Sequence, residues 1–178
     1  MRRINVLLCS LAVAGIGFVS CSDDDSSSNS NESRIEGTYN LVEVNTEEAT
    51  NFDQDGDQNI NQMEESGCYD EGKITLRADN TFTYVYTAIL VDESNGTAGC
   101  AEEVTYTGTW EIEEGAGTTA LIAITYEDEN NDPVTLVLTK QGRELSWMDN
   151  TIFSQYPDRN EAGAAIYRPG STEYVFRK

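Results

Sequence analysis

Apolar and polar residues alternate along most of the chain beyond residue 35. In "VTYTGTWEI" the apolar positions run from Val104 to Ile112 on one face, while threonines and Glu111 occupy the other. A period of two is typical of a β-strand that is buried on one face only. The same pattern recurs in segments 37–44, 73–77, 82–90, 104–112, 120–126, 134–139, 144–147 and 173–178.

Short polar turns connect several of these segments. "ADNT" at 78–81, "EDENNDP" at 127–133 and "QG" at 141–142 supply the Gly, Asn, Asp and Pro residues that tight turns need. No long amphipathic helical pattern competes with the strands. Eight strands in sequential order predict an all-β fold, namely an eight-stranded antiparallel up-and-down barrel. A two-sheet β-sandwich is the alternative.

The inward positions of the predicted strands are rich in aromatic rings. They include Tyr39, Phe82, Tyr84, Tyr86, Tyr106, Trp110, Tyr126, Trp147, Tyr174 and Phe176. An eight-stranded barrel is just wide enough for side chains to fill it or for one small ligand to bind. Candidate ligand-binding residues at the barrel mouth are Tyr84, Tyr86, Tyr106, Trp110 and Trp147. The alternative is a lumen that the rings fill completely.

Residues 1–20 form a targeting segment. Arg2 and Arg3 precede an apolar stretch that is too short and too rich in glycine for a membrane span, which predicts a signal peptide. The stretch ends in "FVSC", which resembles a bacterial lipobox. We therefore expect cleavage before Cys21 and attachment of acyl chains such as palmitate to this cysteine, giving a membrane anchor. An ordinary secreted protein with a chance cysteine is the alternative.

Residues 21–34 are acidic and rich in Ser and Asp, and they contain almost no apolar residue to bury. Such a segment reads as a tether between the lipid and the folded domain. "CSDDD" resembles the surface-export signal of bacteroidete lipoproteins. The expected location is the outer membrane, with the domain facing the cell exterior; a generic polar spacer is the alternative.

The charge balance narrows the classes of partner and chemistry. Eleven Lys and Arg residues against 32 Asp and Glu residues give a net charge of −21, which repels nucleic acid and anionic lipid headgroups. The chain has no histidine, so Ser-His-Asp and Cys-His catalysis and histidine-ligated metals are excluded. No carboxylate pair stands out by its spacing. We therefore expect a monomeric protein that is not an enzyme and binds no nucleic acid.

Four cysteines occur, of which Cys9 leaves with the signal peptide and Cys21 takes the lipid. Cys68 and Cys100 remain in an exported chain, where an oxidising environment favours a disulfide bond. The sequence therefore predicts a Cys68–Cys100 bridge.

An acidic insertion at residues 46–72 separates the first two predicted strands. Its stretch "DQDGDQNINQMEESGC" places oxygen-bearing side chains at the spacing of an EF-hand calcium loop. The candidate metal ligands are Asp53, Asp55, Asp57, Asn59, Asn61 and Glu64. Gln58 stands where the EF-hand has a glycine, so we expect weak calcium binding or a loop that deviates. A solvated acidic loop is the alternative.

The order of four segments, "IEGTYNLVEV", "ITLRADNTFTY", "YTGTWEI" and "EYVFRK", resembles the lipocalin-like domain of bacterial lipoproteins over residues 35–178. The resemblance implies a barrel that binds a small hydrophobic or amphipathic molecule. Tyr39 stands where lipocalins usually carry a tryptophan, and the usual helix before the last strand is not evident. A non-enzymatic interaction or structural lipoprotein with a filled barrel is the second functional class.

Overall fold

The computed structural model describes residues 34–128 and 130–178, so the predicted signal peptide, Cys21 and nearly all of the tether lie outside the described residues. Its elements are β1 (Gly37–Thr50), β2 (Asn59–Asn61), α2 (Gln62–Glu65), η1 (Gly67–Tyr69), β3 (Lys73–Leu76), β4 (Thr81–Tyr86), β5 (Ile89–Asp92), β6 (Thr97–Cys100), β7 (Val104–Ala116), β8 (Thr119–Glu127), β9 (Pro133–Gln141), β10 (Glu144–Asp149), β11 (Gln155–Arg159), β12 (Ala165–Pro169) and β13 (Thr172–Arg177).

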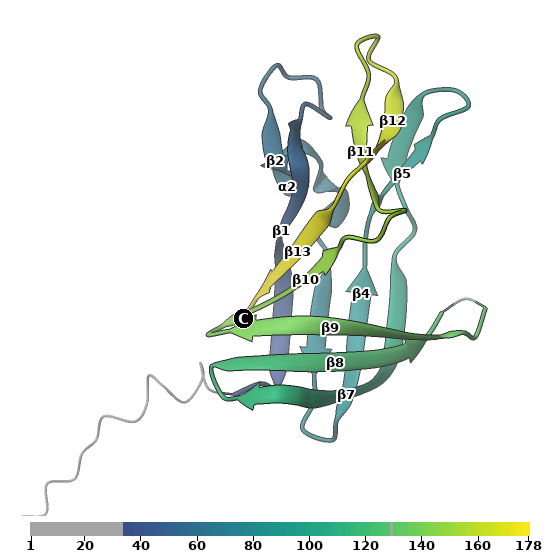
Figure 1. Ribbon diagram of the computed structural model, residues 1–178. Coiled ribbons are helices and arrows are strands. Elements are labelled where there is room, and N and C mark those ends of the chain that lie inside the picture. Colours follow the sequence, from purple (N-terminus) through teal and green to yellow (C-terminus); the bar gives the residue numbers. More distant parts are fainter. Residues whose placement is uncertain (1–33, 129) are drawn as a thin grey trace, which may run out of the picture.

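Eight antiparallel strands close into a barrel (Figure 1). The strand order is β1, β3, β4, β7, β8, β9, β10 and β13, and β13 pairs back with β1. Each strand predicted from the alternating pattern corresponds to one of these barrel strands. The predicted up-and-down barrel is therefore confirmed over the two-sheet sandwich.

Two long strands change partners and thereby turn the corners of the barrel. In β1, residues 37–40 pair with β3, whereas residues 40–46 pair with β13 around an irregularity between Leu41 and Glu43. In β7, residues 104–109 pair with β4 and residues 108–116 pair with β8. Figure 1 shows β7, β8 and β9 running across β1 and β4. The barrel therefore has two crossed layers joined at bent strands.

Aromatic side chains close one end of the barrel. The Tyr39 side chain is fully buried, and its hydroxyl donates to the Ile35 carbonyl at 2.7 Å. The Lys178 ammonium lies 5.5 Å from the centre of the same ring. Nearby, the Trp110 indole N–H donates to the Arg77 carbonyl at 2.9 Å in the β3–β4 turn. Tyr39 thus fills this end of the barrel, at the position where the lipocalins that the sequence resembles usually carry a tryptophan.

The alternating pattern fails beyond the edges of the barrel. Segment 82–90 is predicted as one strand, but β4 ends at Tyr86 and β5 begins at Ile89. The chain leaves the barrel at this point to pair with β6, which reverses the inward face. Ile89 is therefore buried, whereas Leu90, predicted inward, is 61% exposed. Ile112 is 45% exposed because β4 pairs with β7 only as far as Thr109.

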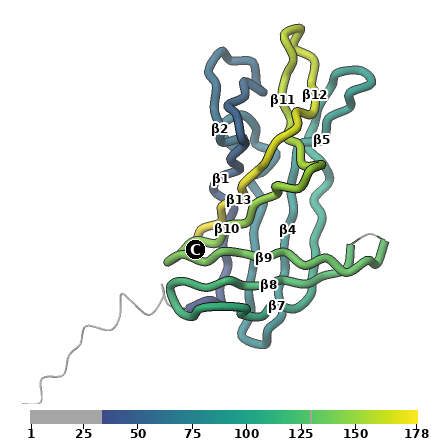
Figure 2. The backbone as a smooth tube through the Cα atoms, in the orientation of Figure 1, coloured from purple at the N-terminus to yellow at the C-terminus, as the bar shows by residue number. Residues whose placement is uncertain are grey.

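Extra hairpins extend the end of the barrel opposite Tyr39. The β1–β2, β5–β6 and β11–β12 hairpins stand there together (Figure 2). The β11–β12 hairpin occupies the position before the last strand where lipocalins usually have a helix. The predicted Cys68–Cys100 disulfide is confirmed, with a Cα–Cα distance of 5.0 Å, and it ties η1 to the end of β6.

Candidate functional site

An aromatic cavity lies inside the barrel at the end that carries the hairpins. Its volume is about 250 Å³, and five strands contribute one or two inward residues each. The lining residues are Tyr84 and Tyr86 from β4, Tyr106 from β7, Tyr126 from β8, Leu136 from β9 and Trp147 from β10. We call this space the aromatic cavity.

Neighbouring rings hold the walls of the aromatic cavity in place. The Tyr106 and Tyr126 ring centres lie 4.5 Å apart with a 37° tilt. The Trp147 indole stacks on Tyr174 at 4.5 Å with an angle of 8° between the planes. Tyr84 packs edge-to-face against Tyr86, with ring centres 6.0 Å apart. Such ring pairs add about 0.5–1.5 kcal/mol each beyond burial, so the lining is preorganised.

The polar atoms of these rings are neutral hydrogen-bonding groups. Burial raises the pKa of Tyr84 well above its usual value and also raises the pKa of Tyr86 and of Tyr126. These phenols therefore stay protonated at neutral pH. The buried Trp147 Nε1 lies close enough to the Tyr84 hydroxyl to lower the pKa of Tyr84 somewhat, but the two atoms do not reach full hydrogen-bond geometry. The indole N–H therefore lies against the Tyr84 hydroxyl at the wall of the cavity.

Two carboxylates lie close enough to the aromatic cavity to act on its tyrosines. Asp149 contributes to the raised pKa of Tyr86, and Asp128 contributes to that of Tyr126. Among the described residues that line the cavity, none carries a charge. The local electrostatic potential is therefore negative.

A groove on the barrel wall borders the aromatic cavity. It has a volume of about 530 Å³ and shares Tyr106 and Tyr126 with the cavity. It lies where residues 104–107 of β7 have left β8, since the β7–β8 pairing begins at Gly108 and Tyr126. Glu127, Asp128 and several threonines complete its lining. We call this groove, which borders the aromatic cavity at Tyr106 and Tyr126, the side opening.

A family model described as a lipocalin-like domain matches residues 35–147. The chain belongs to the lipocalin-like domain family. The match ends within β10, and β13, beyond it, completes this lipocalin-like barrel. No curated protein and no solved structure matches the chain significantly. Within residues 34–128 and 130–178, no helix is long and apolar enough to cross a membrane.

The structure brings together four of the five candidate ligand-binding residues that were predicted at the mouth of this lipocalin-like barrel. Tyr84, Tyr86, Tyr106 and Trp147 line the aromatic cavity. The fifth residue, Trp110, does not line this cavity, because it lies at the closed end with its indole N–H bound to the Arg77 carbonyl. Periodicity gives the face of a strand but not the depth along the barrel, which depends on register. Tyr126 and Leu136 also line the cavity; both are inward by pattern, and only strand register reveals their depth.

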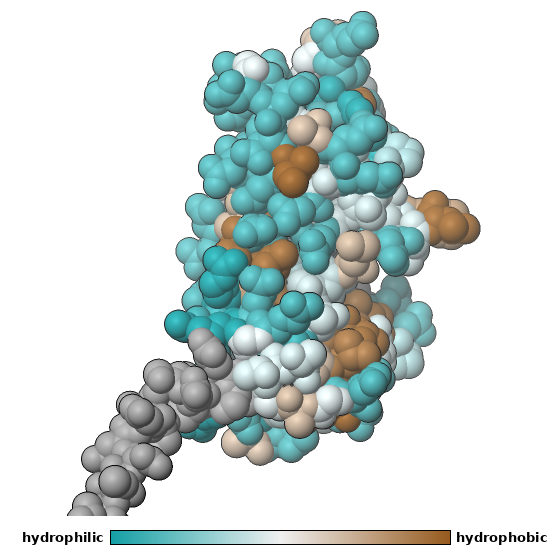
Figure 3. Space-filling model, turned by 60° about the vertical axis from the view of Figure 1, so that its left-hand side comes forward, coloured by the Kyte–Doolittle hydropathy of each residue, from teal (hydrophilic) through white to brown (hydrophobic). Residues whose placement is uncertain are grey.

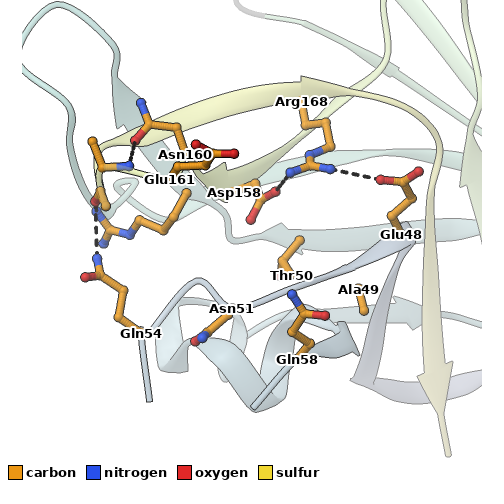
Figure 4. A pocket seen from close by; sticks show the side chains of 13 residues that line it. Glu48, Ala49, Thr50, Asn51, Gln54, Gln58, Asp158, Asn160, Glu161 and Arg168 are labelled. Carbon is orange, nitrogen blue, oxygen red and sulfur yellow. Dashed lines mark hydrogen bonds and ion pairs between the residues drawn. The ribbon is translucent and has the colours of Figure 1, made fainter. Parts of the chain in front are cut away.

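A larger polar pocket of about 610 Å³ lies between the end of β1, the acidic loop and the β11–β12 hairpin (Figure 4). Buried Asp158 pairs with Arg168, which also pairs with Glu48 at 2.9 Å. The Arg159 guanidinium lies 4.7 Å over the Phe52 ring and donates to the Phe52 carbonyl at 3.0 Å. Both arginines are thus engaged within the protein. We interpret the contacts around this pocket as structural, because they hold the β11–β12 hairpin against β1 and the acidic loop.

The acidic loop turns through a series of side chain–backbone hydrogen bonds. Asp53 accepts from the Asp55 N–H at 3.1 Å, and Asp55 accepts from the Asp57 N–H at 2.8 Å. Asn59 accepts from the Asn61 N–H at 3.0 Å. Asn61 itself accepts from the Val44 and Met63 N–H groups, so it caps the short helix α2.

The loop departs from an EF-hand path. Positive φ angles occur at Gln54 (65°) and Gly56 (103°), not at Gln58. Glu64 is exposed, and its neighbour Glu65 is the buried carboxylate, which accepts from the Phe52 N–H at 2.7 Å. Within the part of the chain that the structure describes, no three acidic or cysteine side chains are arranged to hold a metal ion. Calcium binding at Asp53, Asp55, Asp57, Asn59, Asn61 and Glu64 stays a prediction.

Proposed function

We propose that this protein is a lipid-anchored lipocalin-like protein that binds a small amphipathic molecule in the aromatic cavity and performs no catalysis. The observation that carries the proposal is the asymmetry of the barrel. Tyr39 and Trp110 fill one end, whereas rings at the other end surround a space of about 250 Å³. Apolar pockets with a few converging polar groups are the usual form of small-molecule sites.

The size of the aromatic cavity limits the ligand. A volume of about 250 Å³ equals the space of roughly eight water molecules, at about 30 Å³ each in the liquid. A long acyl chain needs more room than this. The phenol hydroxyls and the Trp147 N–H favour a compact molecule that carries at least one polar group.

A cavity-filling variant tests this function. Leu136→Trp adds a ring to the cavity wall and should abolish binding of benzyl alcohol, a neutral amphipathic probe, in saturation-transfer NMR. Val137→Trp is the matched control, because Val137 is the adjacent residue of β9 and is 46% exposed. Equal binding by the wild type and both variants would place the probe outside the aromatic cavity and contradict the proposal.

A second candidate function is interaction with a protein partner through an apolar loop. Ile152 and Phe153, in the segment between β10 and β11, are 92% and 84% exposed. They are the most exposed large apolar residues on a surface that is otherwise mainly hydrophilic, as the face in Figure 3 illustrates. Ligand binding is favoured because the cavity is built from residues of five barrel strands, whereas this loop holds only two adjacent apolar residues.

The lipid anchor and outward display rest on "FVSC" and the "SDDD" that follows it. The Lys178 ammonium binds the Arg34 carbonyl at 3.2 Å, so the chain enters the domain beside the closed end. Replacing Asp23, Asp24 and Asp25 with Ala should preserve lipidation but remove the domain from the cell surface. Resistance of the unmodified protein to protease added to intact cells would contradict outward display.

Calcium binding by the acidic loop is a subsidiary proposal based on the ligand spacing alone. Weak affinity is expected, about 10⁻⁴ to 10⁻³ M as in extracellular modules. Calorimetric titration of the wild type against Asp53→Ala plus Asp55→Ala tests it. Equal and negligible heats from both proteins would leave a solvated loop.

A further inference from the structure

We propose that the aromatic cavity is selective for a small organic cation of the alkylated ammonium class. This inference rests on the proposed function, since it names the chemistry of the ligand that the cavity would hold. It follows from three features: the ring lining, the carboxylates around it, and the polar atoms that the rings present.

The walls of the aromatic cavity would surround a bound cation mainly with the faces and edges of aromatic rings. Five of the six lining residues are Tyr or Trp. A cation within about 6 Å of a ring centre is attracted by the ring quadrupole, most strongly by Trp, and alkylated ammonium groups are the ligands that aromatic cages recognise. An alkylated ammonium also keeps little hydration to lose, so the apolar side chain of Leu136 does not oppose it.

The electrostatic environment separates a cation from an anion of the same size. Asp149 and Asp128 act on the tyrosines of the cavity, and Glu127 lines the side opening with Asp128. The chain as a whole carries a net charge of −21. A carboxylate ligand would find no cationic partner among the described lining residues and would be repelled at the side opening. A cation would be concentrated there by the same field.

The polar atoms of the walls bind the remainder of the ligand. The buried Trp147 N–H lies beside the Tyr84 hydroxyl but has no partner in full hydrogen-bond geometry, and a buried donor without such a partner is unfavourable. A hydroxyl or carbonyl oxygen on the ligand would satisfy it. A compact alkylated ammonium that carries one oxygen therefore matches the cavity in volume, charge and hydrogen bonding.

Three probes of nearly equal shape isolate the effect of charge. Choline is the cation, 3,3-dimethyl-1-butanol is its neutral carbon isostere, and 3,3-dimethylbutanoate is an anion of similar size. In calorimetric titrations of the purified protein, we expect choline to bind at least tenfold more tightly than the alcohol, and the carboxylate most weakly. The preference for choline over the alcohol should shrink in high salt, because the carboxylates around the side opening are exposed to screening.

Variants locate the interaction. Trp147→Leu should reduce choline affinity at least fivefold and reduce the affinity for the alcohol much less. Val137→Leu, at an exposed residue of β9 outside the cavity lining, is the control and should leave the preference unchanged. Asp128→Asn keeps the size of the side chain and should lower the affinity for choline without changing the affinity for the alcohol. This variant keeps the test possible if Trp147→Leu fails to fold.

The outcomes separate this inference from the function on which it rests. Equal affinity for choline and the alcohol, or tighter binding of the carboxylate, would overturn the cation proposal and leave ligand binding in place. Failure of the folded protein to bind all three probes and benzyl alcohol would overturn both. A choline preference that survives in Leu136→Trp would place the cation elsewhere and also overturn the inference.

Discussion

Gly108 shows how a single residue permits the shape of the barrel. A Cβ atom at this position would lie 2.0 Å from the Thr125 carbonyl oxygen and 2.9 Å from a ring carbon of Phe82. No side chain can occupy that space without moving the backbone of β8. Glycine therefore allows β7 to approach β8 closely at the place where it leaves β4 and the side opening begins.

Gly108→Ala should destabilise the protein by about 1–3 kcal/mol, the usual cost of overpacking, or more because backbone must move. Urea unfolding followed by tyrosine and tryptophan fluorescence measures the change. Gly99→Ala in β6 is the matched control, since its Cβ would meet nothing within 4 Å, and it should change stability by less than about 0.5 kcal/mol. Similar losses from both variants would refute the close approach.

Glu65 gives a residue-scale prediction about pH. Burial, with smaller contributions from Asp53 and Asp55, raises its pKa above the usual 4.5, although two backbone N–H groups act in the opposite direction. The folded state therefore holds this proton more tightly than the unfolded state. Its contribution to stability is fully present below the unfolded pKa and is lost as pH rises through the folded pKa.

Glu65→Gln removes the charge and retains an oxygen that can accept from the Phe52 N–H. We expect the melting temperature of Glu65→Gln, relative to the wild type, to increase as the pH is raised from about 4 to 7. Glu64→Gln is the control, because Glu64 is exposed on the same helix. A melting-temperature difference that does not vary with pH would show that Glu65 titrates normally.

At the scale of elements, the strands could be predicted and the hairpins could not. Barrel strands alternate because one face is buried and the other is solvated, and this pattern is visible in the sequence. The β11 strand, "QYPDR", contains a proline and a buried aspartate, both of which argue against a strand. Its Pro157 is tolerated because β11 pairs only with β12. Its Asp158 is tolerated because Arg168, diagonally across the hairpin, forms an ion pair with it.

The candidate site could be predicted only in part, because the pattern gives the face of each strand but not the depth of a residue along the barrel. The pattern identifies Tyr84, Tyr86, Tyr106 and Trp147 as inward residues, and all four line the aromatic cavity. Trp110 obeys the same pattern but lies at the closed end, since depth depends on how far each strand is shifted against its neighbours. The ion pairs of Asp158 and Arg168 are formed across a hairpin that the pattern does not reveal.

The disulfide gives a prediction at the element scale. Cys68 and Cys100 are separated by 32 positions, and in the chain-entropy model closing such a loop stabilises by roughly 3.5 kcal/mol. Cys68→Ser plus Cys100→Ser should therefore lower the free energy of unfolding by about this amount in urea titrations. The wild type treated with a reductant should match the double variant. A loss below about 1 kcal/mol would mean that the β5–β6 hairpin holds η1 without the bridge.

At the scale of the whole molecule, charge opposes compaction. Thirty-two acidic residues against 11 basic residues give a net charge of −21, and among the described residues only four ion-pair contacts within 4.0 Å occur, all involving Arg168 or Arg177. Repulsion between the unpaired carboxylates should destabilise the folded state at low ionic strength. The barrel must be stable enough to overcome this repulsion.

Sodium chloride should therefore raise the melting temperature between about 10 and 300 mM, where the Debye length falls from about 30 Å to below 8 Å. Differential scanning calorimetry measures the shift. A melting temperature that falls with added salt would show that attractive pairs dominate instead.

The closure of β13 on β1 has a consequence for how the barrel is assembled. These two strands pair directly although nearly the whole domain separates them in sequence. A chain emerging from its N-terminal side presents the outer edge of β1 long before β13 can cover it, and an uncovered edge readily pairs with another chain. Contacts between such distant segments also slow folding. The barrel therefore cannot close until β13 is available, and a chaperone that shields β1 until then would be most effective against aggregation.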